Sequence, residues 1–198
     1  MYHMVQSRLY HTVHEDTMTI GKPSASSEQI IDRCLAAFVE FGRLDLSLDQ
    51  LAARVGISKR MLVHYFGGRD VIEEQAMTLL EQKLRAQFSP NNFPARVSAK
   101  TVVTALWERT TSAEAKGVLL LTMDLSRRAW NGSARAKSFY IEQRRLWVEL
   151  LTRYIHDQTT VEELLQLFQG AVLAFLITGD REPGKRALMR VLSRRKSR

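Results

Sequence analysis

Apolar residues recur every three or four positions along most of this chain, which is the spacing of amphipathic α-helices. The stretch SSEQIIDRCLAAFVEFG shows it first, with a serine cap before it and Gly42 after it. Further helices are predicted over LDQLAARV, over 58–66 and over about 70–88. At ~1.5 Å per residue, the last of these is long enough to leave one domain and reach another.

The second half of the chain repeats this helical pattern after a break. SPNNFP at 89–94 combines two prolines with two asparagines and is the best candidate for a boundary. Beyond it, helical patterns cover roughly 94–111, 113–130, 133–156 and 161–178, with a short last one at about 184–194. No stretch alternates as a strand would. We therefore predict an all-α fold of about nine helices.

The first 25 residues lack a hydrophobic period and are predicted to be a flexible arm. His11 and His14 would share a helix face if a helix formed there, and His3 lies nearby, but nothing indicates an ordered scaffold for ligands. We predict no metal site and no cofactor. The arm carries Glu15 and Asp16 in place of the apolar stretch of a signal peptide, so a cytoplasmic protein is expected.

Composition is that of a globular chain: 198 residues, 45% of them hydrophobic, with a single cysteine. Cys34 can form neither an intramolecular disulfide nor a cysteine zinc site, and its apolar stripe indicates a packing residue. The most apolar window runs from Leu164 to Thr178, but two glutamines and Gly170 interrupt it. Its unbroken apolar run is far shorter than the ~20 residues that a bilayer needs, so we expect a buried helix and no membrane partner.

Net charge is +8, but its distribution matters more than its sum. Residues 21–88 hold nine basic and nine acidic side chains, whereas residues 89–198 hold nineteen basic against ten acidic, eight of the bases in the final REPGKRALMRVLSRRKSR. A local excess is found between Leu51 and Arg69, which contains four bases and no acid. Nucleic-acid binding is therefore sought in that segment.

The same segment has the spacing of a helix-turn-helix, in which two short helices cross closely. Gly56 accepts a left-handed turn and Ser58 caps the next helix. The remaining positions are a small residue and apolar anchors: Leu51, Ala52, Val55, Ile57 and Leu62. Most short helical hairpins bind no DNA, but the spacing together with the surrounding bases favours a DNA-binding one.

If Leu62 faces inward, turning ~100° per residue places Arg60 and His64 nearly opposite it, with Met61 and Val63 on the flanks. These four would face the DNA groove. Arg60 has the planar fork that recognises guanine O6 and N7, whereas the two apolar side chains could contact a thymine methyl or exclude water. Lys59 and the amides behind Ser58 lie at the positive end of the helix, which suits phosphate. A solvated surface arginine is the competing interpretation of Arg60.

Residues 28–77 resemble the amino-terminal domain of the TetR family of bacterial transcriptional regulators. IIDRCLAAFVEFG and LSLDQLAARVGISKRMLVHYFGGRDVI carry the resemblance, which covers about a quarter of the chain. Two positions depart from the family pattern: Arg60 replaces a small residue, and Val63 replaces a tyrosine and so removes one phosphate contact. The resemblance implies that Ser47, Lys59, His64, Tyr65 and Arg69 contact phosphate, Tyr65 being partly buried.

The resemblance further implies a helix-turn-helix domain at 26–69 and a helical ligand-binding and dimerisation domain at 70–198. The helix at 161–178 is apolar nearly all round, so one domain covers only one side of it easily, and a partner subunit would cover the other. The expected dimer interface comprises Leu164, Leu165, Phe168, Val172, Phe175, Leu188, Val191 and Leu192. Large apolar side chains with one polar handle suit an apolar effector, and the expected pocket comprises Trp107, Met123, Trp130, Phe139, Gln143 and Trp147. The competing interpretation of the helix at 161–178 is a central helix of a monomer. The competing interpretation of the expected pocket residues is that they are ordinary core residues.

These expectations amount to a ligand-released repressor that binds a palindromic operator in double-stranded DNA as a homodimer, with a small-molecule effector of unknown identity. An enzyme is not expected, because no catalytic constellation or phosphate-binding glycine loop is present. The alternative is a helical small-molecule-binding protein with a degenerate DNA reader, favoured by the neutral charge of 21–88. Non-specific binding through the basic tail at 185–198 is a third possibility.

Overall fold

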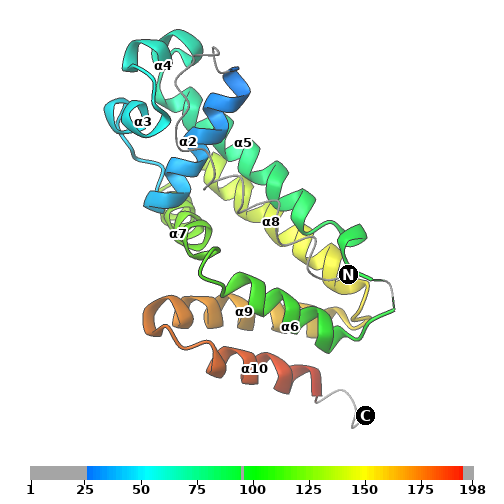
Figure 1. Cartoon of the computed structure of the whole chain (residues 1–198). Coiled ribbons are helices and arrows are strands. Elements are labelled where there is room, and N and C mark those ends of the chain that lie inside the picture. Colours follow the sequence, from blue (N-terminus) through cyan, green and yellow to red (C-terminus); the bar gives the residue numbers. More distant parts are fainter. Residues whose placement is uncertain (1–25, 95, 194–198) are drawn as a thin grey trace, which may run out of the picture. The chain divides into compact units, whose positions relative to one another are not determined.

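The computed structural model describes residues 26–94 and 96–193, and within them the chain is helical without strands (Figure 1). Nine α-helices and one 3-10 turn make up this part of the chain, so the predicted all-α class is confirmed. Their bounds are α2 Ser27–Phe41, α3 Leu48–Val55, α4 Lys59–Phe66, α5 Arg69–Gln87, η2 Pro90–Asn92, α6 Ala99–Thr110, α7 Lys116–Trp130, α8 Ala134–Thr152, α9 Gln158–Thr178 and α10 Glu182–Ser193. The histidines of the arm and the bases at 194–198 lie outside the described residues.

Side-chain caps fix where the first helices begin. The Ser26 and Ser47 hydroxyls each accept a hydrogen bond from the amide three residues on, and the amides of the two serines donate in turn to the side-chain oxygens of Gln29 and Gln50. These reciprocal capping boxes satisfy amides that a helix start leaves unpaired. In the second half, α6 begins only after the Ser98 cap, although the apolar pattern extends back to about residue 94, whereas α9 begins at Gln158, before the predicted residue 161.

The described residues form two compact units. The first comprises residues 26–84 together with Leu120–Asp124 from the middle of α7. Its core is built from buried side chains of α2 to α5, among them Phe38, Leu51, Leu62 and Ile72. This unit continues to Leu84, past the expected end of the helix-turn-helix domain at Arg69, and Ile72, Ala76, Met77 and Leu80 of α5 are buried. The expected domain bounds stay a prediction.

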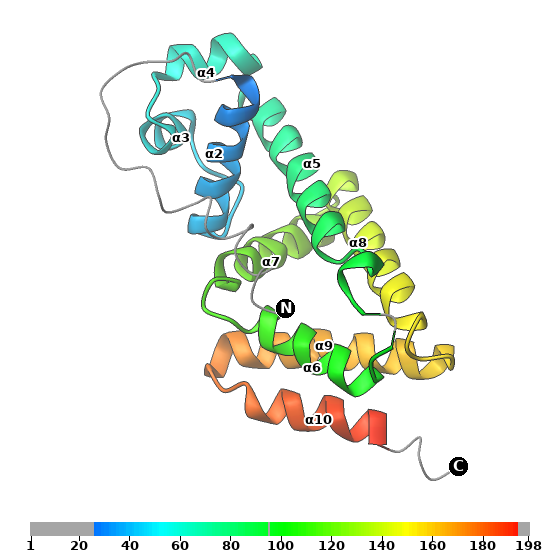
Figure 2. The ribbon, with the colours of Figure 1, turned by 45° about the vertical axis from the view of Figure 1, so that its right-hand side comes forward.

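The second unit contains the described residues of 85–119 and of 125–193. In both views α6, α9 and α10 lie side by side (Figures 1 and 2), and α9 also contacts α8. Trp107 of α6 is buried in this core, edge-on to Phe168 at 5.5 Å between ring centroids. Its indole Nε1 donates to the Arg181 carbonyl at 3.2 Å, which ties α6 to the start of α10.

α9 is less buried than its apolar sequence suggests. Within the described residues it is the one helix long and apolar enough to cross a membrane by length and composition alone, with a mean hydropathy of 1.4. Only 33% of that apolar window is buried inside the chain. The expectation of a buried helix therefore holds for one face, which includes Val161, Leu164 and Val172, and not for the other.

Candidate nucleic-acid interface

The turn between α3 and α4 has the predicted geometry. Gly56 adopts φ 75°, in the left-handed region, and its amide donates to the Ala52 carbonyl at 3.0 Å. A side chain other than glycine would be strained there. Two residues later, the Ser58 hydroxyl accepts from the Met61 amide at 3.2 Å and starts α4. Three residues, 56–58, therefore separate α3 from α4.

The apolar side chains expected to hold the two short helices together are buried, apart from that of Ile57. Leu51, Ala52 and Val55 of α3 are buried, as is Leu62 of α4, while Ile57 in the turn is half-buried. Phe66 adds a second buried anchor at the end of α4. Burial of these side chains fixes the rotation of α4 about its own axis, and so decides which residues it presents outward.

The outward face of α4 carries the four predicted groove residues. Arg60 and His64 are exposed, and Met61 and Val63 keep 40% and 41% of their surface accessible. Apolar side chains so exposed, on a helix whose opposite side is fully anchored, suit a surface that is covered when a partner binds.

Electrostatic pairing singles out Arg60 on this unit. Among the described residues from 26 to 84, every other lysine or arginine has an acceptor within the chain. These contacts are Arg43 to Asp45 at 3.3 Å, Arg54 to Glu40, Lys59 to Asp49 at 3.0 Å, Arg69 to Glu73 at 3.2 Å, Lys83 to Asp32 at 2.6 Å, and Arg33 to the Val55 carbonyl at 3.4 Å. Arg60 therefore offers a guanidinium with its donors unused.

The residues assigned to phosphate contacts are arranged around that face. Ser47 and Ser58 occupy the N-caps of α3 and α4, so a phosphate near either would meet a hydroxyl and free helix amides. Tyr65 is half-buried, with its ring edge-on to His64 at 5.7 Å. Lys59 and Arg69 are exposed but already ion-paired, so a phosphate would have to compete with Asp49 and Glu73.

One contribution to this unit was missed from the sequence. The carboxylate of Asp124, in the middle of α7, accepts a hydrogen bond from the Leu44 amide at 3.1 Å. Leu44 lies in the loop that leads from α2 to the Ser47 cap of α3. Beside it, Gly42 closes α2 at φ 63° and is packed against Leu120. A hydrogen bond between residues 80 positions apart leaves no local sequence signal.

The six residues expected to line an effector pocket come from three helices, α6, α7 and α8, and two of them, Trp107 and Trp147, both lie against the Phe168 ring. Trp130 is 91% exposed at the end of α7, and Met123 belongs to the first unit. Trp107 is buried in the core of the second unit. The remaining three lie on one helix, α8: Phe139 is buried, Gln143 has a buried amide nitrogen without a hydrogen-bond partner among the described residues, and Trp147 lies 4.5 Å from the Phe88 ring.

The residues expected at a dimer interface divide into two groups. Leu164, Leu165, Val172 and Leu188 are buried in the chain's own core and so are not available to a partner. Phe168, Phe175, Val191 and Leu192 are partly buried against that core. The exposed apolar residues of α9 are instead Leu173 and Ile177. An interface on α9 and α10 stays a prediction.

Cys34 is a packing residue, as its position in the apolar stripe predicts. It is fully buried in α2, and burial raises the pKa of its thiol to about 12. The thiolate is therefore absent at neutral pH, which leaves no nucleophile at this position.

Comparison with known proteins agrees with this geometry. The HTH-type transcriptional regulator BetI of Serratia proteamaculans (strain 568) is 33% identical to this chain over 82 residues, covering 38% of the chain and 41% of the relative. BetI of Escherichia coli O139:H28 (strain E24377A / ETEC) is 33% identical over 66 residues, covering 33% and 34%. The matches thus span less than half the length of these relatives. No protein-family model matches the chain.

A solved structure covers more of the chain. The crystal structure of SCO7518 from Streptomyces coelicolor A3(2), a candidate transcriptional regulator, covers 83% of this chain and 96% of its own, with a TM-score of 0.64 at 21% identity. This likeness establishes the fold. Within that fold, α3 and α4 form a helix-turn-helix whose second helix presents an exposed face. The matches to BetI support the resemblance of this chain to the TetR family of regulators.

Proposed function

We propose that this chain is a DNA-binding transcriptional regulator that recognises a palindromic operator as a homodimer and is released from it by a small-molecule effector. The proposal is supported by the BetI relatives, whose names assign them to HTH-type transcriptional regulation, and by the geometry of α4. A recognition helix in this motif lies in the major groove, with side chains near its N-terminus contacting base edges.

The observation that carries the proposal is the unpaired guanidinium of Arg60. An arginine at a major-groove surface donates two parallel hydrogen bonds to guanine O6 and N7, and each such pair discriminates by about 1–3 kcal/mol. Arg60 is exposed and has no acidic neighbour to displace, so binding DNA costs it no existing ion pair. Met61 and Val63, on its flanks, would contact a thymine methyl or exclude water.

Phosphate contacts would set the position of α4 without reading sequence. Ser58 and the amides behind it present the positive end of α4 to a phosphate, and Ser47 does the same for α3. Lys59 would exchange Asp49 for a phosphate, and Arg69 would exchange Glu73. His64 and Tyr65 complete the proposed contacts further along α4.

The effector would bind the second unit at α8. Gln143 and Trp147 lie one turn apart and therefore on the same face of that helix. The buried amide nitrogen of Gln143 supplies a donor without a partner, and the Phe88, Trp147 and Phe168 rings supply an apolar wall. A largely apolar molecule with one hydrogen-bond acceptor fits this combination. It would act by preferring the conformation that fits DNA poorly.

The test is fluorescence anisotropy of the protein on DNA from its own promoter region, with a random duplex as competitor, over a series of salt concentrations. We expect a preference of ~10³ or more for one fragment. Arg60→Ala should remove most of that preference. Arg60→Lys is the matched control, because it keeps the charge and loses the planar fork, so affinity should survive better than specificity.

Two further results would decide between the proposal and its competitors. A chain ending at Ser193 removes the terminal bases, and sequence preference should survive that truncation if α4 recognises bases. Equal binding of both duplexes by the full chain, abolished by truncation, would assign binding to the tail. No binding to either duplex would leave a helical small-molecule-binding protein with a degenerate DNA reader.

A further inference from the structure

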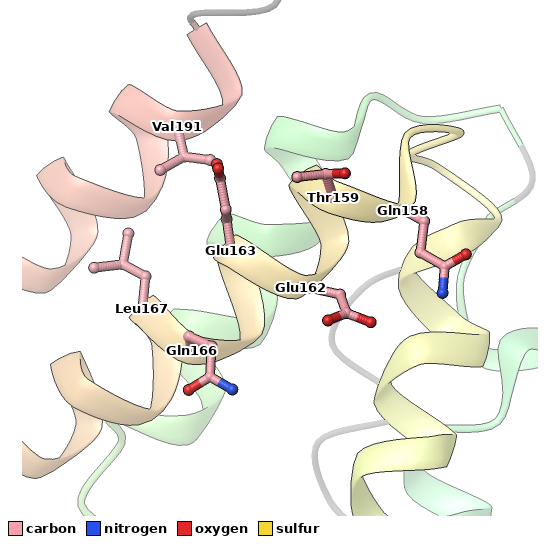
Figure 3. Close-up of a pocket in the computed structure, with 7 residues that line it drawn as sticks. All are labelled: Gln158, Thr159, Glu162, Glu163, Gln166, Leu167 and Val191. Carbon is pink, nitrogen blue, oxygen red and sulfur yellow. The ribbon is translucent and has the colours of Figure 1, made fainter.

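A surface groove of about 800 Å³ opens along the first half of α9, where the end of α10 lies beside it (Figure 3). α9 and α10 are consecutive helices that lie side by side, so the chain leaves α10 next to the start of α9. Leu167 and Val191 form the apolar part of the groove, and its charged side chains are the neighbouring carboxylates Glu162 and Glu163. The groove therefore offers an acidic edge beside a small apolar surface.

The two carboxylates differ in what balances their charge. Glu162 lies 3.5 Å from the Arg144 guanidinium of α8. Glu163 is exposed and has no ion-pair partner among the described residues, and its side chain points from α9 towards Val191 (Figure 3). A cation that enters the groove from the α10 side would therefore pair with Glu163 without displacing an existing ion pair.

The residues that follow α10 carry charge of the opposite sign. α10 ends at Ser193, two residues after Val191, and the next five residues are RRKSR, with four bases and no acid. Because an extended chain spans at most ~3.3–3.6 Å per residue, the backbone of these five residues stays within about 18 Å of Ser193. A connection this short keeps the bases near the groove at an effective concentration on the order of millimolar.

We propose that residues 194–198 bind in this groove of their own chain, where their bases pair with Glu163 and their aliphatic stems cover Leu167 and Val191. A segment held there is kept away from DNA. The contact is therefore autoinhibitory, because it suppresses the non-specific binding that a basic segment gives through phosphate contacts. The docking itself stands apart from the proposed function, and only its consequence for DNA binding rests on it.

This contact is expected to be weak and reversible. An exposed ion pair changes an equilibrium by only about 1.4–5-fold, because both partners are well solvated when they are apart. The short tether adds to the ion pair without fixing the segment in one conformation. Effects on DNA binding are therefore expected to be a few-fold, so the contact is tested both directly and through DNA.

A zero-length carbodiimide cross-link tests the contact directly, because it joins an amine to a carboxylate only where the two groups meet. We expect the full chain to yield an amide between Lys196 and Glu163, identified by peptide mass spectrometry in the band that migrates as a monomer on a denaturing gel. Lys196→Arg keeps the charge and removes the reactive amine, and Glu163→Gln removes the carboxylate. Each variant should abolish this product.

Two cross-linking results would overturn the inference. One is a Lys196 amine that reacts evenly with several exposed carboxylates, including Glu182 at the far end of α10, since this would show no preferred site. The other is the Lys196–Glu163 product in a dimer band alone, which would place the segment in the groove of a second copy.

Affinity for a random duplex measures the consequence of docking. Glu163→Gln should raise that affinity by about 2–5-fold in the full chain. Glu182→Gln, which removes the same charge at the far end of α10, is the matched control and should raise it less. In a chain ending at Ser193 the two variants should behave alike. An equal effect of Glu163→Gln with and without residues 194–198 would reflect net charge only and would contradict the inference. A protein that binds no duplex at all would refute the proposed function, while the cross-link would still decide the docking.

Discussion

Substituting Gly42 tests whether the middle of α7 belongs to the first unit. It ends α2 in the left-handed conformation at φ 63°, and the Arg43 amide behind it donates back to the Phe38 carbonyl at 3.2 Å. A Cβ at this position would lie 2.6 Å from the Leu120 Cβ on α7. Gly42→Ala therefore introduces both backbone strain and a steric clash.

The two penalties can be estimated separately. An L-residue in the left-handed conformation costs about 1–2 kcal/mol. The clash adds overpacking of about 1–3 kcal/mol, since the atom that is struck is a Cβ fixed to the α7 backbone and not the end of a flexible side chain. The expected loss is about 2–5 kcal/mol, a large share of a typical domain's stability. Gly56→Ala, at φ 75° with no atom within 4 Å of its Cβ position, should show the strain alone.

The assay is urea unfolding of the three proteins followed by far-UV circular dichroism, with equal slopes required before midpoints are compared. Gly42→Ala should lower the free energy of unfolding by at least ~1 kcal/mol more than Gly56→Ala does. Equal losses would mean that Leu120 does not pack on the end of α2, and would remove the α7 segment from this unit. Trimming Leu120 to alanine should not rescue Gly42→Ala, because the Cβ that causes the clash remains.

Further predictions concern Asp124 and Cys34. Asp124→Ala leaves the amide of Leu44 without its acceptor and should lower the free energy of unfolding by about 1–3 kcal/mol in the same urea assay. Asp124→Asn keeps an oxygen acceptor and should lower it by less. Equal losses in the two variants would argue against this hydrogen bond. Burial raises the Cys34 pKa from 9.0 to about 12, so the unfolded chain loses the thiol proton at lower pH than the folded chain. The protonated Cys34 thiol therefore makes its full contribution to the free energy of unfolding below pH 9, and this contribution is lost between pH 9 and about 12. Cys34→Ala should reduce that decline when the free energy of unfolding is measured over this pH range. A thiol that reacts rapidly with a disulfide reagent in the folded protein at pH 8 would contradict this burial.

Local signals account for most of what the sequence predicts correctly. Ser47, Gly56 and Ser58 determine backbone geometry within one turn of themselves, so the ends of α3 and α4 follow from the residue types alone. The outward placement of Arg60 and His64 then follows from helical periodicity once Leu62 is taken as buried. None of this depends on contacts between distant parts of the chain.

What sequence reasoning missed depends on such contacts. The apolar pattern of α9 is nearly continuous, so it could not distinguish Leu164, which packs inside the chain, from Ile177, which does not. Likewise, Trp107 and Trp130 are chemically identical, yet one is buried in a core and the other is exposed at a helix end. Only the packing of several helices together separates these positions.

Charge gives the clearest case of this difference between composition and structure. The equal numbers of acids and bases in residues 21–88 argue against DNA binding when they are only summed. In the structure most of those charges neutralise one another in ion pairs, and Arg33 donates to a backbone carbonyl. Among the described residues from 26 to 84, the guanidinium left without an acceptor is that of Arg60, on the outward face of α4. A nucleic acid meets the charges that remain unpaired at its own surface. The near-zero net charge of 21–88 is therefore compatible with base recognition. Because Lys59 and Arg69 must give up Asp49 and Glu73 before they can contact phosphate, the ion pairs weaken non-specific binding more than specific binding.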